Sequence, residues 1–159
     1  TQIEGYASLF GSTDQGGDIV KKGAYAASLA AIAKAGRQIK MLWQHDPTAP
    51  IGVWDQVYED DKGLYVKGRL LDGVQQAKEA AVLIEAGALD GLSIGYRTTR
   101  ALPRKSGGRE LVELDLWEVS LVTFPMLPSA RITGKSDDII PEITELAELI
   151  RSVSASVTL

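Results

Sequence analysis

The chain has 159 residues, a formal net charge of −4 and no cysteine. Its length favours one domain and excludes a complete α/β barrel. The acidic balance argues against a surface that neutralises nucleic-acid phosphates, so we expect no nucleic-acid partner. The lack of cysteine excludes disulfides, thiol catalysis and cysteine metal sites. His45 is the single histidine, so any mechanism that needs an imidazole depends on that residue.

Apolar residues are spread along the chain in short runs. None of these runs reaches the roughly 18 residues that a membrane-spanning helix needs, so we expect no membrane partner. No signal-peptide pattern is visible. The absence of cysteine agrees with a reducing cytoplasm.

The N-terminal third predicts a strand, a loop, a helix and a second strand. Residues 3–10 have a strand pattern, and residues 11–17 form a polar, glycine-rich loop. Residues 25–35 are rich in alanine and carry apolar side chains at helical spacing. Residues 39–44 predict a short strand, and the prolines that follow it predict an irregular link.

The middle of the chain predicts a hairpin followed by a helix. Residues 51–58 and 64–71 are predicted strands on either side of a short loop that ends in glycine. Residues 73–86 carry an apolar stripe at helical spacing, and Gly87 is suited to end this helix.

Residues 89–100 predict a strand, and residues 110–124 predict a long strand with an irregularity. In the second strand, apolar side chains occupy even positions up to Leu116 and odd positions from Trp117 onward. Because side chains alternate with a period of two, this change of face requires a bulge or bend near residues 116–118. Bulges often re-aim a side chain beside a functional site.

Together these elements predict an α+β fold that is mainly antiparallel β with about three helices. The third helix begins after Asp137 or Asp138 and carries an apolar stripe up to Ile150. We expect residues 1–134 to form the domain core. We expect residues 135–159 to form a C-terminal helix and tail, packed on the core or at a subunit contact.

Residues 91–95 read Gly-Leu-Ser-Ile-Gly, which matches the G-x-S-x-G pattern of a nucleophile elbow. An elbow needs a strand, a turn and then a helix, whereas here a helix precedes Ser93 and a strand follows it. In the hydrolases that carry an elbow, the serine also precedes the histidine, whereas His45 precedes Ser93. The pattern therefore does not indicate an α/β-hydrolase.

Ser93 and His45 nevertheless form a candidate nucleophile and base. A serine hydroxyl is a poor nucleophile without a neighbouring base, and histidine can supply that base near neutral pH. A third group normally orients the imidazole. Glu118 is the first candidate, because it lies in an otherwise apolar run at the predicted bulge. The alternatives are Asp115, Asp46 and Asp90.

Short stretches in a fixed order between residues 5 and 132 carry a family resemblance. They are Gly-Tyr-Ala-Ser-Leu-Phe at 5–10, Gly-Asp-Ile-Val at 17–20, Gly-Ala-Tyr at 23–25, Lys-Met-Leu-Trp-Gln-His-Asp at 40–46, Pro-Ile-Gly at 50–52, Gly-Leu at 63–64, Gly-Leu-Ser-Ile-Gly-Tyr at 91–96 and Leu-Trp-Glu-Val-Ser-Leu-Val-Thr-Phe-Pro at 116–125. Together they resemble the prohead proteases of tailed double-stranded DNA bacteriophages. No single stretch is specific, but the ordered combination is.

This resemblance implies a fold similar to that of the herpesvirus capsid-assembly protease, a small closed or partly open β-barrel flanked by helices. It also implies a serine endopeptidase that cleaves the major capsid protein or a scaffold segment, and often itself. Such an enzyme acts inside the immature capsid in the host bacterial cytoplasm. The resemblance further favours a homo-oligomer, because the herpesvirus relatives are dimeric.

The same resemblance assigns the site residues. The serine of the Leu-Ser-Ile-Gly stretch falls on Ser93 as the nucleophile, and the histidine of Gln-His-Asp falls on His45 as the general base. The acid of Trp-Glu-Val-Ser falls on Glu118, which would orient His45. The herpesvirus enzyme uses a second histidine as its third member, and this chain has none. This chemistry needs no metal or organic cofactor.

Two other interpretations compete with the protease. One is a catalytically silent capsid-assembly or scaffold module of the same fold, although such a module would usually lose Ser93 or His45. The other is a hydrolase of small esters. The oxyanion-hole donors stay open between backbone N–H groups near Ser93 and those of residues 118–120. The basic residues between Arg97 and Arg109 predict a solvated loop face.

Overall fold

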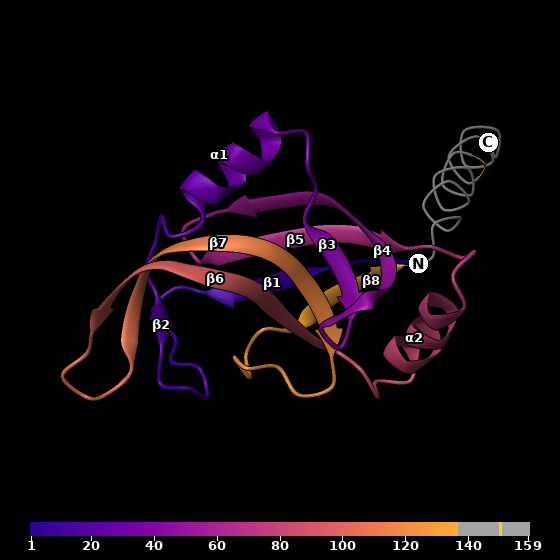
Figure 1. The fold of residues 1–159 in the computed structure, drawn as a ribbon. Helices are drawn as coiled ribbons and strands as arrows, with labels where there is room; N and C mark the ends of the chain where they lie inside the picture. The colour runs from indigo at the N-terminus through magenta and orange to yellow at the C-terminus, as the bar shows by residue number, and fades with distance from the viewer. Residues whose placement is uncertain (137–149, 151–159) are drawn as a thin grey trace, which may run out of the picture.

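The computed structural model describes residues 1–136 and Ile150 (Figure 1). The strands of this part are β1 (Gln2–Leu9), β2 (Ile19–Val20), β3 (Lys40–Trp43), β4 (Asp46–Glu59), β5 (Gly63–Leu70), β6 (Gly91–Pro103), β7 (Arg109–Val122) and β8 (Ile132–Ser136). They form one sheet in the order β2-β7-β3-β4-β5-β1-β8, with β6 paired to β7. β2 and β3 run parallel to β7, and the other pairs are antiparallel.

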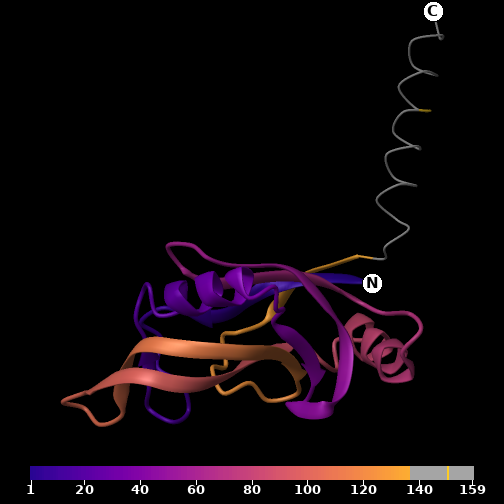
Figure 2. The same ribbon diagram turned by 45° about the horizontal axis from the view of Figure 1, so that its top comes forward.

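Two helices lie within the described residues, α1 (Ala26–Lys34) and α2 (Gln75–Glu85). α1 connects β2 with β3 and packs against β7 and β4, whereas α2 connects β5 with β6 and packs against β4 and β5. They therefore cover separate parts of the sheet (Figure 1, Figure 2). Both were predicted, to within two residues at each end. The expected total of about three helices is not confirmed, because the residues predicted to form the C-terminal helix lie, apart from Ile150, outside the described residues.

In the part of the chain that the structure describes, neither helix has the length and apolar character needed to cross a membrane.

The sheet is not closed into a barrel. Near its outer strands β6 and β8 there is one isolated bridge, between Gly91 of β6 and Arg131, the residue before β8. Two hydrogen bonds flank this bridge, from Leu92 N–H to the Ala130 carbonyl (2.9 Å) and from Ile132 N–H to the Asp90 carbonyl (2.8 Å). The start of β6 therefore touches the start of β8 without a continuous ladder. The closed form of the expected barrel is not found.

β7 contains the bulge that its apolar pattern predicts. Gly95 of β6 pairs with Glu118, but the next residue, Tyr96, pairs with Leu116, so Trp117 is the extra residue on β7. Leu116 and Val119 are buried in the core, while the side chain of Trp117 points outward and is 60% exposed. The extra residue turns Glu118 toward the same face of the hairpin as Ser93.

β4 begins earlier than the sequence indicates. The expected irregular link over residues 46–50 is part of the strand, which starts at Asp46. Its register against β3 shifts twice, because Met41 pairs with Gly52, Leu42 with Pro50, and Trp43 with Asp46. Proline is tolerated in a strand at such irregularities, where no ladder hydrogen bond is required from it.

Two strands were not predicted, and both lack an apolar alternation. β2 has two residues, which is too short for a period to be recognised. β8 has the sequence Ile-Thr-Gly-Lys-Ser and joins the sheet by pairing with β1. Backbone pairing defines these strands, since β2 buries only Val20 and β8 has no buried side chain.

Candidate active site

Three strands bring the candidate residues together around the end of β7. Ser93 of β6 pairs in register with Ser120 of β7, and Gly95 pairs with Glu118. On the other edge of β7, β3 ends with Trp43 paired to Leu121. The turn that follows β3 carries His45, so the histidine reaches the face on which Glu118 and Ser120 lie.

His45 occupies a strained two-residue turn between β3 and β4. Trp43 pairs with Asp46, so Gln44 and His45 are the two turn residues. Their φ angles are 51° and 60°, the left-handed pattern of a type I′ hairpin turn, where Asn and Gly are the usual residues. A residue with a side chain pays about 1–2 kcal/mol for this conformation. Strain of this kind is concentrated at functional sites.

Contacts with the end of β7 hold this turn in place. The N–H of Gln44 donates to the Leu121 carbonyl at 2.9 Å. The Gln44 side chain donates through Nε2 to Thr123 Oγ1 at 2.7 Å and accepts through Oε1 from Thr123 N–H at 3.2 Å. The N–H of His45 donates to Ser120 Oγ at 3.0 Å. These bonds compensate for the backbone strain at the turn.

The imidazole of His45 is paired with a buried carboxylate. His45 Nδ1 lies 2.5 Å from Glu118 Oε1, and Ser120 Oγ donates to Glu118 Oε2 at 2.5 Å. Glu118 is only 9% exposed, and each of its carboxylate oxygens has a partner, as a buried charge requires. Because Nδ1–H of the neutral ring donates to the carboxylate, the lone pair of the ring lies on Nε2.

Glu118 also raises the basicity of this ring. The pKa of His45 is raised above its usual value, chiefly by the hydrogen bond to Glu118. The negative charge of Glu118 adds to this increase, and partial burial of the ring acts in the opposite direction. His45 is therefore tuned toward accepting a proton.

Gly95 explains the second glycine of the G-x-S-x-G pattern. A Cβ atom on Gly95 would lie 2.1 Å from Glu118 Oε1 and 2.6 Å from its Cδ. The pattern thus has a physical basis that differs from a nucleophile elbow, since the absent side chain leaves room for the carboxyl group of Glu118.

Ser93 and His45 line one cavity of about 140 Å³. Ser93 is 5% exposed, so a substrate would reach its hydroxyl through this cavity. The wall is mainly apolar, with side chains that include Ala7, Leu92, Ile94, Tyr96, Met126 and Leu127. The wall also includes the carboxylates of Asp14 and Asp18. Burial and these two negative charges raise the pKa of Tyr96.

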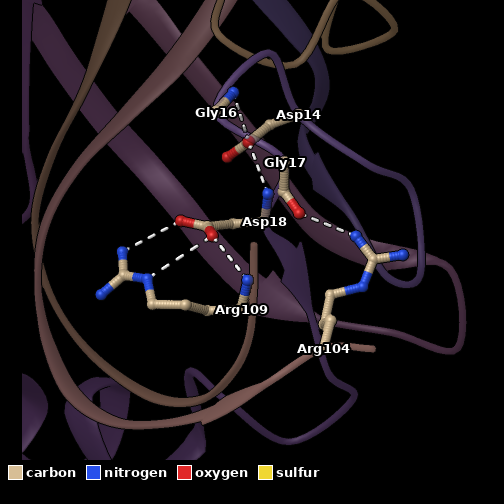
Figure 3. Close-up of polar contacts among 6 residues, drawn as sticks. All are labelled: Asp14, Gly16, Gly17, Asp18, Arg104 and Arg109. Carbon is tan, nitrogen blue, oxygen red and sulfur yellow. Dashed lines mark hydrogen bonds and ion pairs between the residues drawn. The ribbon is translucent and has the colours of Figure 1, made fainter. Parts of the chain in front are cut away.

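The loop over residues 11–18 forms part of this wall and is folded around Asp14. One oxygen of the Asp14 carboxylate accepts hydrogen bonds from the N–H groups of Gly16 and Asp18, each at 2.9 Å (Figure 3). The N–H of Gln15 donates to the Met126 carbonyl at 2.9 Å. The loop is therefore fixed both within itself and against another part of the cavity wall.

The β6–β7 hairpin holds the same loop from outside the cavity. Asp18 accepts from the N–H of Arg109 and forms an ion pair with Arg109 Nη2, both at 2.9 Å, and Arg104 Nη1 donates to the Gly17 carbonyl at 2.7 Å (Figure 3). The guanidinium of Arg109 lowers the pKa of Asp18. Arg104 and Arg109 were expected on a solvated loop face, but they support the cavity wall.

The alternative acids are engaged elsewhere. Asp115 accepts from Trp117 Nε1 at 2.9 Å and lies 3.8 Å from Arg97 Nη2. Asp46 accepts from the N–H and hydroxyl of Thr48, and Asp90 forms an ion pair with Arg131 at 2.6 Å. Of the four acids considered, Glu118 is the one that contacts the imidazole.

Sequence reasoning did not identify Ser120, which contacts both Glu118 and the backbone of His45. Its position two residues after Glu118, on the same face of one strand, was the available signal. No three metal-ligating side chains come together anywhere in residues 1–136, so these residues offer no evident site for a metal ion.

Comparison with known proteins identifies the family to which this chain belongs. The sequence model of the Caudovirus prohead serine protease family matches residues 1–142. The prohead protease of Enterobacteria phage HK97 is 35% identical over 156 residues, which cover 94% of this chain and 67% of that protein.

Two solved structures share the fold. The capsid assembly protease of bacteriophage T4 superposes with a TM-score of 0.60 at 16% identity, over 76% of this chain and 80% of that chain. KSHV protease, solved with a hexapeptide phosphonate inhibitor, gives a TM-score of 0.53 at 14% identity, over 97% of this chain and 76% of that chain. On the family match and the HK97 relative, the chain belongs to the prohead serine proteases of tailed bacteriophages.

Proposed function

We propose that this chain is a serine endopeptidase that cleaves capsid or scaffold protein, and itself, during prohead maturation. Ser93 is the nucleophile, His45 the general base and Glu118 the acid that orients His45. The observation that carries the proposal is that His45, bonded through Nδ1 to Glu118, lines the same cavity as the nearly buried Ser93. The family match and the HK97 prohead protease support a role in capsid maturation.

The reaction follows acyl-enzyme chemistry. Ser93 Oγ attacks the carbonyl carbon of the scissile peptide bond while His45 Nε2 takes the hydroxyl proton. The tetrahedral intermediate collapses, the C–N bond breaks, and His45 returns the proton to the leaving amine. Water then attacks the acyl-enzyme, with His45 as base, and its collapse releases the new carboxyl terminus and regenerates Ser93.

Glu118 contributes by fixing the imidazole. Its hydrogen bond to Nδ1 presents Nε2 to Ser93 and stabilises the imidazolium that forms in each step. The carboxylate is held in this position because each of its oxygens has a hydrogen-bond partner, His45 Nδ1 on Oε1 and the Ser120 hydroxyl on Oε2.

The test is processing of the phage's major capsid protein by the co-expressed protease. Ser93→Ala should abolish the cleaved product, because the hydroxyl that forms the acyl-enzyme is missing. Ser106→Ala is the matched control, because Ser106 lies in the exposed loop between β6 and β7, and it should process normally. Undiminished cleavage by Ser93→Ala, with unchanged folding, would overturn the proposal.

The same experiment separates the competing functions. A catalytically silent assembly module would give no cleavage with the unaltered chain, yet would still change capsid assembly. A hydrolase of small esters would turn over simple esters and leave capsid protein intact. Action inside the immature capsid, in the host cytoplasm and as a homo-oligomer, is part of the proposal and rests on the family relationship.

A further inference from the structure

We propose that Ser120 is a positioning residue that fixes the base and the acid of the site relative to each other. This inference rests on the proposed function, since it concerns the same His45–Glu118 pair. It goes further by assigning a task to a residue outside the nucleophile, base and acid.

The hydroxyl of Ser120 forms one hydrogen bond with each residue of this pair. Ser120 is 0% exposed, so water does not compete for its bonds. Its one proton is donated to Glu118 Oε2 at 2.5 Å, and its oxygen accepts from the N–H of His45 at 3.0 Å. One donated and one accepted bond leave the hydroxyl a single orientation. The short bond to an ionised oxygen is of the stronger, charge-assisted kind.

The hydrogen bond between Ser120 and the backbone of His45 stabilises a residue with an unfavourable backbone conformation. His45 has a φ of 60°, a conformation that persists only where surrounding contacts enforce it. The neighbouring bonds of Gln44 fasten the turn to Leu121 and Thr123. The bond to Ser120 adds a link that those contacts lack, because Ser120 also holds Glu118.

Ser120 therefore links the position of the base, His45, to the position of the acid, Glu118. The backbone N–H of His45 and the carboxylate of Glu118 both bond to the hydroxyl group of Ser120. The position of each residue therefore depends on the position of this one group. Ser120 also pairs in register with Ser93, so the nucleophile, the acid and Ser120 are located by adjacent positions of one hairpin. A shift of the turn relative to the carboxylate would therefore disturb the bonds of Ser120.

The effect of removing the hydroxyl follows from these contacts. In Ser120→Ala the carboxylate loses its second partner and can turn away from Nδ1, and the His45 N–H loses its acceptor. Since the hydrogen bond that His45 donates to Glu118 is the main cause of the raised His45 pKa, that pKa should fall toward its ordinary value. Catalysis should suffer in kcat rather than in KM, because no contact with substrate is removed.

The test compares Ser120→Ala and Ser120→Cys with Ser28→Ala. Ser28 is a matched control, because it is also a buried serine whose oxygen accepts an N–H bond, from Leu116 of β7 at 2.9 Å. The readouts are kcat and KM on a capsid peptide, and the pKa of His45 by NMR. Because the chain has a single histidine, its ring signal needs no assignment.

We expect Ser120→Ala to lose up to about 100-fold in kcat, the cost of a misplacement near 1 Å, and to lower the His45 pKa. Ser120→Cys, which keeps the shape and a weak donor, should lie between Ser120→Ala and the unaltered chain. Ser28→Ala should lose stability without moving the His45 pKa. An unchanged His45 pKa and kcat in both Ser120 variants would overturn the inference, and so would an equal pKa shift in Ser28→Ala.

The NMR titration separates failure of this inference from failure of the proposed function. It reports on the His45–Glu118 pair without any substrate. Normal processing by Ser93→Ala would therefore reject the proposed nucleophile and leave the test of Ser120 as positioning residue intact.

Discussion

Gly95 and Glu118 occupy adjacent positions across the β6–β7 hairpin, and the carboxyl group of Glu118 lies where a Gly95 side chain would be. A Cβ atom there would stand within 2.7 Å of Oε1, Cδ and Cγ of Glu118. Gly95 is not among the residues with positive φ. Glycine is therefore required here by this contact and not by the backbone conformation.

Gly95→Ala should displace the carboxylate from His45 and lower kcat by about 100-fold, the cost of a misplacement near 1 Å. Stability should fall as well, because the displaced carboxylate would lose the partners that it needs when buried. Steady-state kinetics and thermal unfolding measure both effects. Gly73→Ala, where a Cβ would meet no atom within 4 Å, is the control. Full activity in Gly95→Ala would contradict the assigned role of Glu118.

The raised pKa of His45 predicts the pH dependence of cleavage. The base must be neutral to take the Ser93 proton, so kcat/KM should rise with pH through a midpoint above 6.5, the usual pKa of histidine. Glu118→Gln removes the main cause of the raised pKa, so this midpoint should move to lower pH while kcat falls.

A pH–rate profile measures both effects, with Asp115→Asn as control. Asp115 lies on the same strand and bonds to Trp117 rather than to His45, so this control should keep the midpoint. An unchanged midpoint in Glu118→Gln would show that another group sets the basicity of His45.

At the scale of elements, the tip of the β6–β7 hairpin supports one wall of the cavity. Arg109 joins Asp18 through its backbone and its guanidinium, and Arg104 holds Gly17. The two backbones are in direct contact, since a Cβ on Gly108 would lie 2.0 Å from the Gly17 carbonyl oxygen. The loop over residues 11–18 therefore takes its position from the hairpin.

Arg109→Ala should loosen this loop and weaken substrate binding. The ion pair is partly exposed, so we expect only a modest rise in KM, up to about fivefold, with kcat nearly unchanged. Arg97→Ala removes an arginine of the same hairpin that faces Asp115 instead, and it should keep the KM. A fall in kcat at constant KM in Arg109→Ala would contradict a role limited to the cavity wall.

The strands that sequence analysis could predict are those that bury one face. The change of apolar positions at Leu116 and Trp117 located the bulge. A strand that buries one face has apolar residues at every second position, so an extra residue interrupts this pattern in the sequence. The start of β4 has no such pattern, since exposed residues and two prolines occupy it. The left-handed turn at Gln44 and His45 was equally hidden, because a Gln-His pair is not one of the usual sequences of a type I′ turn.

At the scale of the whole molecule, sequence could predict the mainly antiparallel class but not how the sheet ends. The outer strand β8 carries glycine, lysine and serine, so its pairing with β1 and the single bridge from Arg131 to β6 depend on backbone contacts. Ser93, His45 and Glu118 were predicted as a site from their motifs. Their spatial relation arises from three strand pairings, of β6 with β7, β7 with β3, and β3 with β4.

The central claim is that Ser93 is a nucleophile activated by His45. The most direct measurement is intact-mass spectrometry after treatment with a fluorophosphonate, in which the Ser93 oxygen would bond to phosphorus and displace fluoride. We predict a single adduct located at Ser93, absent in Ser93→Ala, strongly reduced in His45→Ala and unaffected in Ser106→Ala. No adduct on the unaltered chain, or an adduct that persists in Ser93→Ala, would contradict the claim.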